Sequence, residues 1–140
     1  MEQSLVLIKP DGVKHSNIGD IITRFERKGL KIEAIKMLWL DEELAKEHYS
    51  EHAGKVFFGN LIDYITAGPI VALVIAGQKA IRVIRNMAGA TDPVEARPGT
   101  IRGDLAADLD HGNVIHASDC RENARREIEL FFSVDEIFSY

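Results

Sequence analysis

Four segments of the chain have the apolar pattern of β-strands. Residues 5–8 form a continuous apolar run, which indicates a strand buried on both faces. Residues 31–40 alternate polar and apolar positions, as a strand with one covered face does. Residues 70–75 are rich in β-branched side chains and fit a central strand, and residues 114–115 suggest a short fourth one. The pattern predicts a four-stranded sheet.

Helical spacing predicts helices between and after these strands. The clearest begins at Asn17, which can cap it, and stops at Gly29; its apolar residues recur every three or four positions. Four further helices are expected at residues 41–51, 57–65, 79–87 and 120–132.

The order of these elements predicts an α+β fold. It fits a ferredoxin-like split βαβ sandwich, in which a four-stranded antiparallel sheet is covered on one face by helices. Residues 9–12, Lys-Pro-Asp-Gly, indicate a tight turn after the first strand. Periodicity is absent from residues 88–112, which contain two of the four prolines. A segment of that length is too long for a simple connection, and its arginines favour a functional loop.

Length and composition limit the class of protein. A chain of 140 residues, 46% hydrophobic and 28% charged, is typical of a soluble globular protein, and we expect a single domain over residues 1–140. The formal net charge of -5 argues against nucleic acid or an anionic membrane as the main partner. The single cysteine, Cys120, excludes an internal disulfide, and no uncharged stretch could span a bilayer. These features predict a cytoplasmic protein.

His116 is the first candidate for chemistry. It follows an apolar pair and precedes the last predicted helix, for which Asp119 would be the N-cap with Glu122 three residues on. A histidine held at such a corner can act as a nucleophile. It can equally be a core histidine bonded to Ser118, and this segment alone leaves both interpretations open.

Three cations stand near the ends of predicted elements: Lys9, Arg85 and Arg102. Gathered beside a histidine, they would form an anion site, because arginine matches phosphate oxygens and lysine supplies a compact charge. Each one taken singly is more often a solvated surface charge. The chain lacks both glycine-rich nucleotide-binding patterns, so side chains would have to hold any phosphates.

Glu127 lies at the edge of the apolar stripe of the last helix, about two turns along a helix that begins just after His116. From there it could hydrogen-bond one ring nitrogen and so leave the other free to attack. The alternative is an exposed charge paired with Arg126 or Asn123.

A competing pattern is His48-Tyr49-Ser50-Glu51-His52, which resembles a zinc-binding His-x-x-Glu-His helix and would indicate a zinc hydrolase. Gly54 follows almost at once, and no further acid is marked out as a third ligand. We therefore expect both histidines to face solvent.

Taken together, several motifs resemble those of the nucleoside diphosphate kinase family, in its short bacterial or archaeal form. They occur in order over essentially the whole chain: Lys9-Pro10-Asp11-Gly12-Val13, Gly68-Pro69, Gly89-Ala90-Thr91-Asp92-Pro93, Pro98-Gly99-Thr100-Ile101-Arg102-Gly103-Asp104 and Asn113-Val114-Ile115-His116-Ala117-Ser118-Asp119. The segment from Leu105 to Gly112 is one residue longer than is usual in that family.

The resemblance implies a ping-pong reaction through a phosphohistidine on His116, with the γ-phosphate passing from one nucleoside triphosphate, typically ATP, to a different diphosphate. Phe57 would stack on the base, and Ser118 and Glu127 would orient the imidazole, with Tyr49 close by. The implied phosphate-binding residues are Lys9, Arg85, Thr91, Arg102 and Asn113.

Two further expectations come from the resemblance. Mg²⁺ would be carried on the nucleotide phosphates, with Asp119 a ligand at most through water. The protein would form a hexamer or a tetramer built from dimers. A rival interpretation is a regulatory module that keeps the fold without turnover, although such a module would not need the nucleophile.

Overall fold

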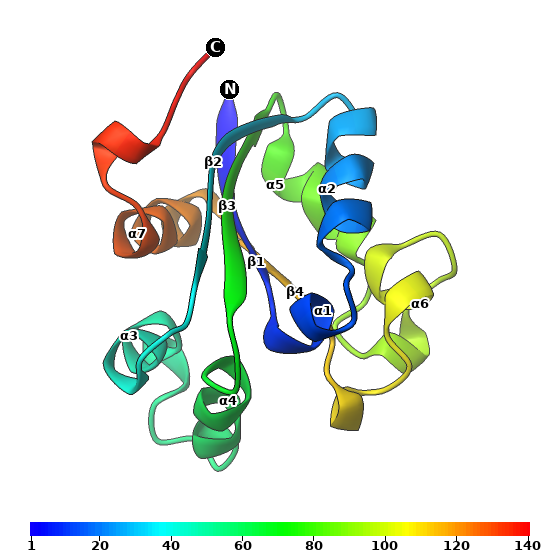
Figure 1. The fold of residues 1–140 in the computed structure, drawn as a ribbon, viewed down its shortest axis with the longest axis vertical. Coiled ribbons are helices and arrows are strands. Elements are labelled where there is room, and N and C mark those ends of the chain that lie inside the picture. The colour runs from blue at the N-terminus through cyan, green and yellow to red at the C-terminus, as the bar shows by residue number, and fades with distance from the viewer.

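A single antiparallel sheet lies at the centre of the protein in the computed structural model, which describes residues 1–140 (Figure 1). Its strands run in the spatial order β2-β3-β1-β4. Every neighbouring pair is antiparallel, so the predicted four-stranded ferredoxin-like sheet is confirmed. The strands are β1 (Glu2–Ile8), β2 (Lys31–Leu38), β3 (Ile70–Gly77) and β4 (Ile115–Ala117).

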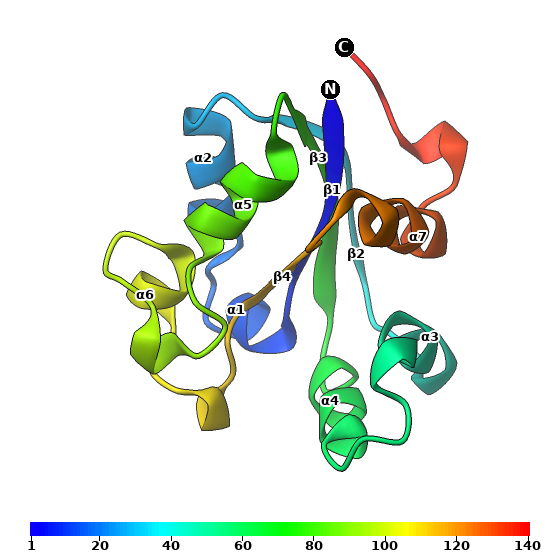
Figure 2. The same cartoon turned by 180° about the vertical axis from the view of Figure 1, so that it is seen from behind.

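Helices cover both faces of this sheet, as Figures 1 and 2 show from opposite sides. Leu5 and Leu7 of β1 pack into one apolar core, and Val6 and Ile8 pack into the other. The first core lies against α3 (Glu42–His48), α4 (Phe58–Ile65) and α7 (Arg121–Phe131), and the second against α2 (Ile18–Arg27) and α5 (Ala80–Ala88).

The prediction that helices cover one face was therefore wrong. All eight residues of β3 are buried, and so are the last five of β1, and strands that apolar must be shielded on both sides.

Two predicted irregular segments contain short helices. Residues 9–12 were expected to form a turn, but Lys9 is the N-cap of α1 (Pro10–Lys14), where proline fits the first helical position. The predicted loop, residues 88–112, contains α6 (Ile101–Leu105) and two 3-10 turns, Pro93–Glu95 and Leu109–His111.

Helix caps were predicted with mixed success. Asp41, the first residue of the helix expected over residues 41–51, is the N-cap of α3, since its side chain accepts from the Leu44 amide at 2.8 Å. The N-cap of α7 is Cys120 and not Asp119, whose carboxylate instead accepts from Asn123 Nδ2 at 2.7 Å. No helix is long and apolar enough to cross a membrane.

Candidate functional site

A cavity of about 1060 Å³ opens where α4 faces the start of α1 and the segment before β4. Four of the predicted substrate-binding residues line it: Lys9, Phe57, Thr91 and Asn113. Of these, Phe57 is 45% exposed. Arg85, Arg102 and His116 do not line this cavity; they lie around β4, next to Asn113.

Lys9 connects the cavity to the strand that carries the histidine. It directly follows β1, is 7% exposed, and its Nζ donates to Asn113 Oδ1 at 2.8 Å. Its ammonium also lies 5.2 Å from the centre of the Tyr64 ring. Burial lowers the pKa of Lys9 to about 7; the positive charge of Arg102 adds to this effect and Asp11 opposes it. Its buried ammonium lacks a full counter-charge, and an anionic ligand would supply one.

The backbone before β4 is held by Asp11 and Tyr64, two residues that sequence reasoning missed. The Tyr64 hydroxyl donates to one carboxylate oxygen of Asp11, and the Val114 amide donates to the other at 3.0 Å. Val114 has a φ of 69°, which is unfavourable for a β-branched residue. The carboxylate thus holds a strained backbone directly before the histidine strand.

Arg102 and Arg85 bind the backbone on either side of His116. The Arg102 guanidinium donates to the carbonyls of Ile115 at 2.7 Å, Gly89 at 2.8 Å and Asn113 at 3.1 Å. Exposed Arg85 donates to the Ala117 carbonyl at 3.2 Å. Burial lowers the pKa of Arg102 to about 10, with Arg85 contributing further, so the residue stays charged near neutral pH.

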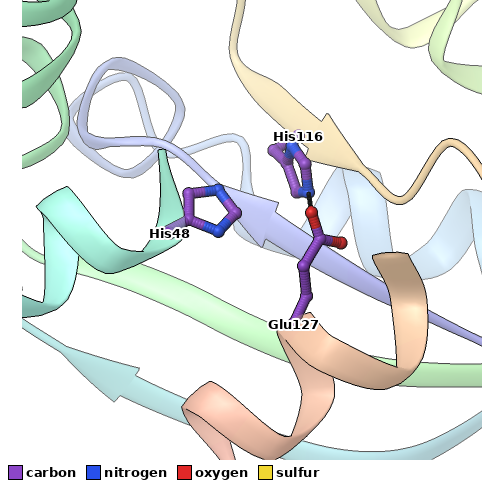
Figure 3. A group of neighbouring side chains, drawn as sticks. All are labelled: His48, His116 and Glu127. Carbon is purple, nitrogen blue, oxygen red and sulfur yellow. Dashed lines mark ion pairs between the residues drawn. The ribbon is translucent and has the colours of Figure 1, made fainter. Parts of the chain in front are cut away.

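His116 is the middle residue of β4, and its ring points toward α7 (Figure 3). Its Nε2 lies 3.1 Å from Glu127 Oε2, and the ring edge carrying Nδ1 faces away from the acid. The contact is a close pair that is not aligned as a full hydrogen bond. Glu127 is 4% exposed, and Ser118 Oγ donates to its other oxygen at 2.6 Å. The acid is thereby held against one chosen ring nitrogen.

His48 is buried, so the prediction that both histidines of the His-x-x-Glu-His pattern face solvent was wrong. Helix α3 ends at His48, and His52 sits on the following 3-10 turn, partly exposed. The ring of His48 packs edge-on against that of His116, with centroids 4.7 Å apart and planes at 85°. Burial, with the charges of His116 and Lys9, lowers the pKa of His48 to about 2, so the ring is neutral.

Three predicted residues remain: Tyr49, Thr91 and Asp119. Tyr49 is buried beside His48, 4.7 Å between ring centroids, and burial together with Glu127 raises its pKa to about 12. Thr91 is exposed, and its carbonyl accepts from Asn113 Nδ2 at 3.1 Å. Asp119 is exposed, and its bond from Asn123 lowers its pKa.

Two sequence relatives cover nearly the same length. The chain is 57% identical over 142 residues to a nucleoside diphosphate kinase of Pyrococcus furiosus, covering 100% of this chain and 88% of the relative. It is 56% identical over 140 residues to that of Archaeoglobus fulgidus, with 100% and 92% covered.

Solved structures agree with the sequence relatives. A halophilic nucleoside diphosphate kinase from Halobacterium salinarum in complex with CDP superposes with a TM-score of 0.95 at 50% identity, covering 99% of this chain and 92% of that one. A transition-state mimic of nucleoside-diphosphate kinase from Borrelia burgdorferi, with bound vanadate and ADP, has a TM-score of 0.93 at 40% identity, with 99% and 91% covered. The family model for nucleoside diphosphate kinase matches residues 2–137. The chain therefore belongs to the nucleoside diphosphate kinase family.

Proposed function

We propose that this protein is a nucleoside diphosphate kinase that works through a phosphohistidine on Nδ1 of His116. The observation that carries the assignment is the buried Ser118–Glu127 pair, which faces Nε2 and leaves Nδ1 on the free ring edge. An acid beside Nε2 favours the tautomer with its proton there, so the lone pair for attack is on Nδ1.

The reaction consists of two transfers at one atom. In the first, Nδ1 attacks the γ-phosphorus of a nucleoside triphosphate, an N–P bond forms, and the bond to the bridging β-phosphate oxygen breaks. The diphosphate leaves. In the second, a terminal oxygen of another diphosphate attacks the same phosphorus, and the N–P bond breaks. As the imidazole loses electron density, Glu127 stabilises the positive charge that develops on the ring.

Catalysis by this chain rests on positioning and on charge. Lys9 and Asn113 would hold phosphate oxygens at the inner end of the cavity, and Arg85 and Thr91 would complete the contacts from the outside. Arg102 already donates to three carbonyls, so its main contributions would be to fix the strand and to supply positive potential.

Phe57 would stack on the base at the cavity edge. Stacking requires only a π-face, so the enzyme would accept any base. The cavity of about 1060 Å³ is large enough for a nucleotide.

The side chains present fit Mg²⁺ that is carried by the nucleotide. Asp119 is exposed, and one of its carboxylate oxygens accepts from Asn123, which leaves the other for contact with the ion through water. Both carboxylate oxygens of Asp11 already accept hydrogen bonds from the protein. When bound, the ion would neutralise negative charge on the phosphates, whose oxygens it prefers to a protein cage. The chain itself would supply Lys9 and the arginines around it.

Three further inferences concern the whole protein. We infer that residues 1–140 act as one domain, that the enzyme is cytoplasmic, and that it assembles as a hexamer or tetramer built from dimers. The family membership supports each of them, and light scattering tests the last.

The decisive experiment is the intact mass after brief mixing with magnesium ATP, followed by a chase with GDP. The wild type should gain one acid-labile phosphoryl group and lose it to GDP as GTP forms. His116→Ala should gain none, and His15→Ala, which changes an exposed histidine elsewhere, should behave as the wild type. A folded wild type that stays unmodified and forms no GTP would leave a nucleotide-binding module as the better interpretation.

A further inference from the structure

Three side chains of types that bind metals lie together, each from a different element, and His116 is one of them (Figure 3). His48 comes from the end of α3, His116 from β4 and Glu127 from α7. Each offers one ligand atom, and these atoms lie within 4.8 Å of one another. Phosphoryl transfer uses His116 and Glu127, but it gives no reason for a second imidazole at this point.

The second imidazole is bonded to nothing in the protein. His48 is 3% exposed, and neither of its ring nitrogens has a hydrogen-bond partner; Nε2 of His116 also lacks an aligned one. Buried polar atoms nearly always have partners, so the unpartnered ring of His48, with a ligand atom within 4.8 Å of those of His116 and Glu127, indicates a ligand. Burial keeps the pKa of His48 at about 2, and a neutral imidazole is the form that binds metals.

The donor set selects the metal. Two imidazole nitrogens and one carboxylate oxygen are the protein ligands of many zinc enzymes, whereas Mg²⁺ prefers oxygen. Ligand atoms about 2.1 Å from a tetrahedral zinc lie about 3.4 Å from each other. The ligand atoms, now within 4.8 Å of one another, would have to move together by up to roughly 1.4 Å on binding. Lys9 and Arg126 add positive potential at His48, which should make the affinity moderate.

We propose that His48, His116 and Glu127 bind Zn²⁺, and that bound zinc stops phosphoryl transfer. A neutral imidazole carries one proton, which in the reactive ring is on Nε2. Zinc can bind Nε2 only through its lone pair, so the proton on Nε2 must move to Nδ1. The lone pair of Nδ1 that is needed for attack is then lost. Binding stands on the geometry alone, whereas the inhibition rests on the proposed function.

The binding test is calorimetry of the full chain with Zn²⁺ and no nucleotide. One zinc per chain should bind to the wild type, and excess Mg²⁺ should not displace it. His48→Gln and His116→Gln should each weaken binding at least about 10-fold. His52→Gln is the matched control in the same segment and should keep full affinity. Co²⁺ in place of zinc should give the visible absorption of a tetrahedral site, and the same variants should lose it.

Each outcome of the binding test has a definite meaning. Equal affinity in the wild type and both ligand variants would assign the metal to surface histidines and overturn the site. Circular dichroism checks that the variants fold. If His48→Gln does not, His116→Gln and Glu127→Gln decide.

The inhibition test measures phosphorylation by magnesium ATP at a free zinc concentration set by a chelating buffer. Zinc should block phosphorylation of the wild type and of His52→Gln but not of His48→Gln. Zinc that binds without slowing the wild type would overturn the inhibition. A wild type that is not phosphorylated even without zinc would refute the kinase assignment and leave the calorimetric result intact.

Discussion

Ser118 joins the first strand to Glu127, the acid that we propose orients His116. Its Oγ accepts from the Leu5 amide at 2.9 Å and donates to Glu127 at 2.6 Å, in a fully buried position. Ser118→Ala should lower the free energy of unfolding by about 1–3 kcal/mol, because it leaves a buried amide without its side-chain acceptor and a carboxylate without its donor.

Urea unfolding measures this change in stability. Single-turnover phosphorylation of Ser118→Ala should also be slower, because Glu127 loses the hydrogen bond that holds it in place. Ser50→Ala, at an exposed position, is the control. Equal stability of Ser118→Ala and the wild type would contradict the role given to this hydrogen bond.

Lys9 makes stability depend on pH. Its pKa falls from 10.5 to about 7 on folding, so the unfolded chain binds more protons between these values and the free energy of unfolding rises with pH across that window. Lys9→Met removes this contribution. Its free energy of unfolding, relative to that of the wild type, should therefore be highest near pH 7 and fall as the pH approaches 10.5.

Unfolding curves of Lys9→Met and the wild type at several pH values test this. Lys14→Met, at the exposed last residue of α1, is the control and should differ from the wild type by a constant amount. A constant difference for Lys9→Met as well would show that the buried ammonium carries no such cost.

Much of the site could be predicted at the level of single residues, because motifs hold Lys9, Asn113 and His116 in recognisable local contexts. The burial of His48 was not predicted although a signal existed: His48 lies three residues after apolar Ala45, on the same side of the helix. The pairing of Asp11 with Tyr64 could not be predicted, because it joins residues 53 positions apart in the chain.

Among the elements, α6 depends on one glycine. A Cβ on Gly103 would lie 1.9 Å from the Arg97 carbonyl oxygen, and Gly103 follows Arg102 directly. Gly103→Ala should displace this helix, cost about 1–3 kcal/mol of stability or more, and lower kcat/KM because Arg102 moves with it.

Gly59→Ala in α4 is the matched control for Gly103→Ala. A Cβ there meets nothing within 4 Å, so the change should be neutral or stabilise by about 0.4–1 kcal/mol. Thermal unfolding and steady-state kinetics distinguish the two glycines. Similar results for both would show that α6 tolerates the added carbon.

At the scale of the whole molecule, the pattern of apolar residues in the strands predicted the antiparallel sheet correctly. It did not predict the helices on the second face of the sheet. The continuous apolar run of β1 already required cover on both faces, but helix periodicity does not reveal which face of a sheet a helix will occupy. Residues 88–112 lacked a pattern because their helices span five residues or fewer.

The edge strand β2 offers a surface for the expected assembly. Ile35, Met37 and the adjoining Trp39 are 54%, 58% and 64% exposed, an apolar row beside an unpaired strand edge. Met37→Lys should reduce the mass measured by light scattering while the chain stays folded. Val134→Lys, which charges an exposed apolar residue elsewhere, should not. An unchanged mass for Met37→Lys would place the subunit contact on another face.

The strand order also has a consequence for synthesis on the ribosome. Strand β1 is made first but lies between β3 and β4, so its second edge waits for residues 115–117. A nascent chain that has already joined β1 to β3 therefore keeps an open apolar edge until translation is nearly complete. Such edges invite pairing with other chains. Stalled or truncated products that end before β4 should consequently be the forms that aggregate. His116 cannot be in place until synthesis has entered the last fifth of the protein.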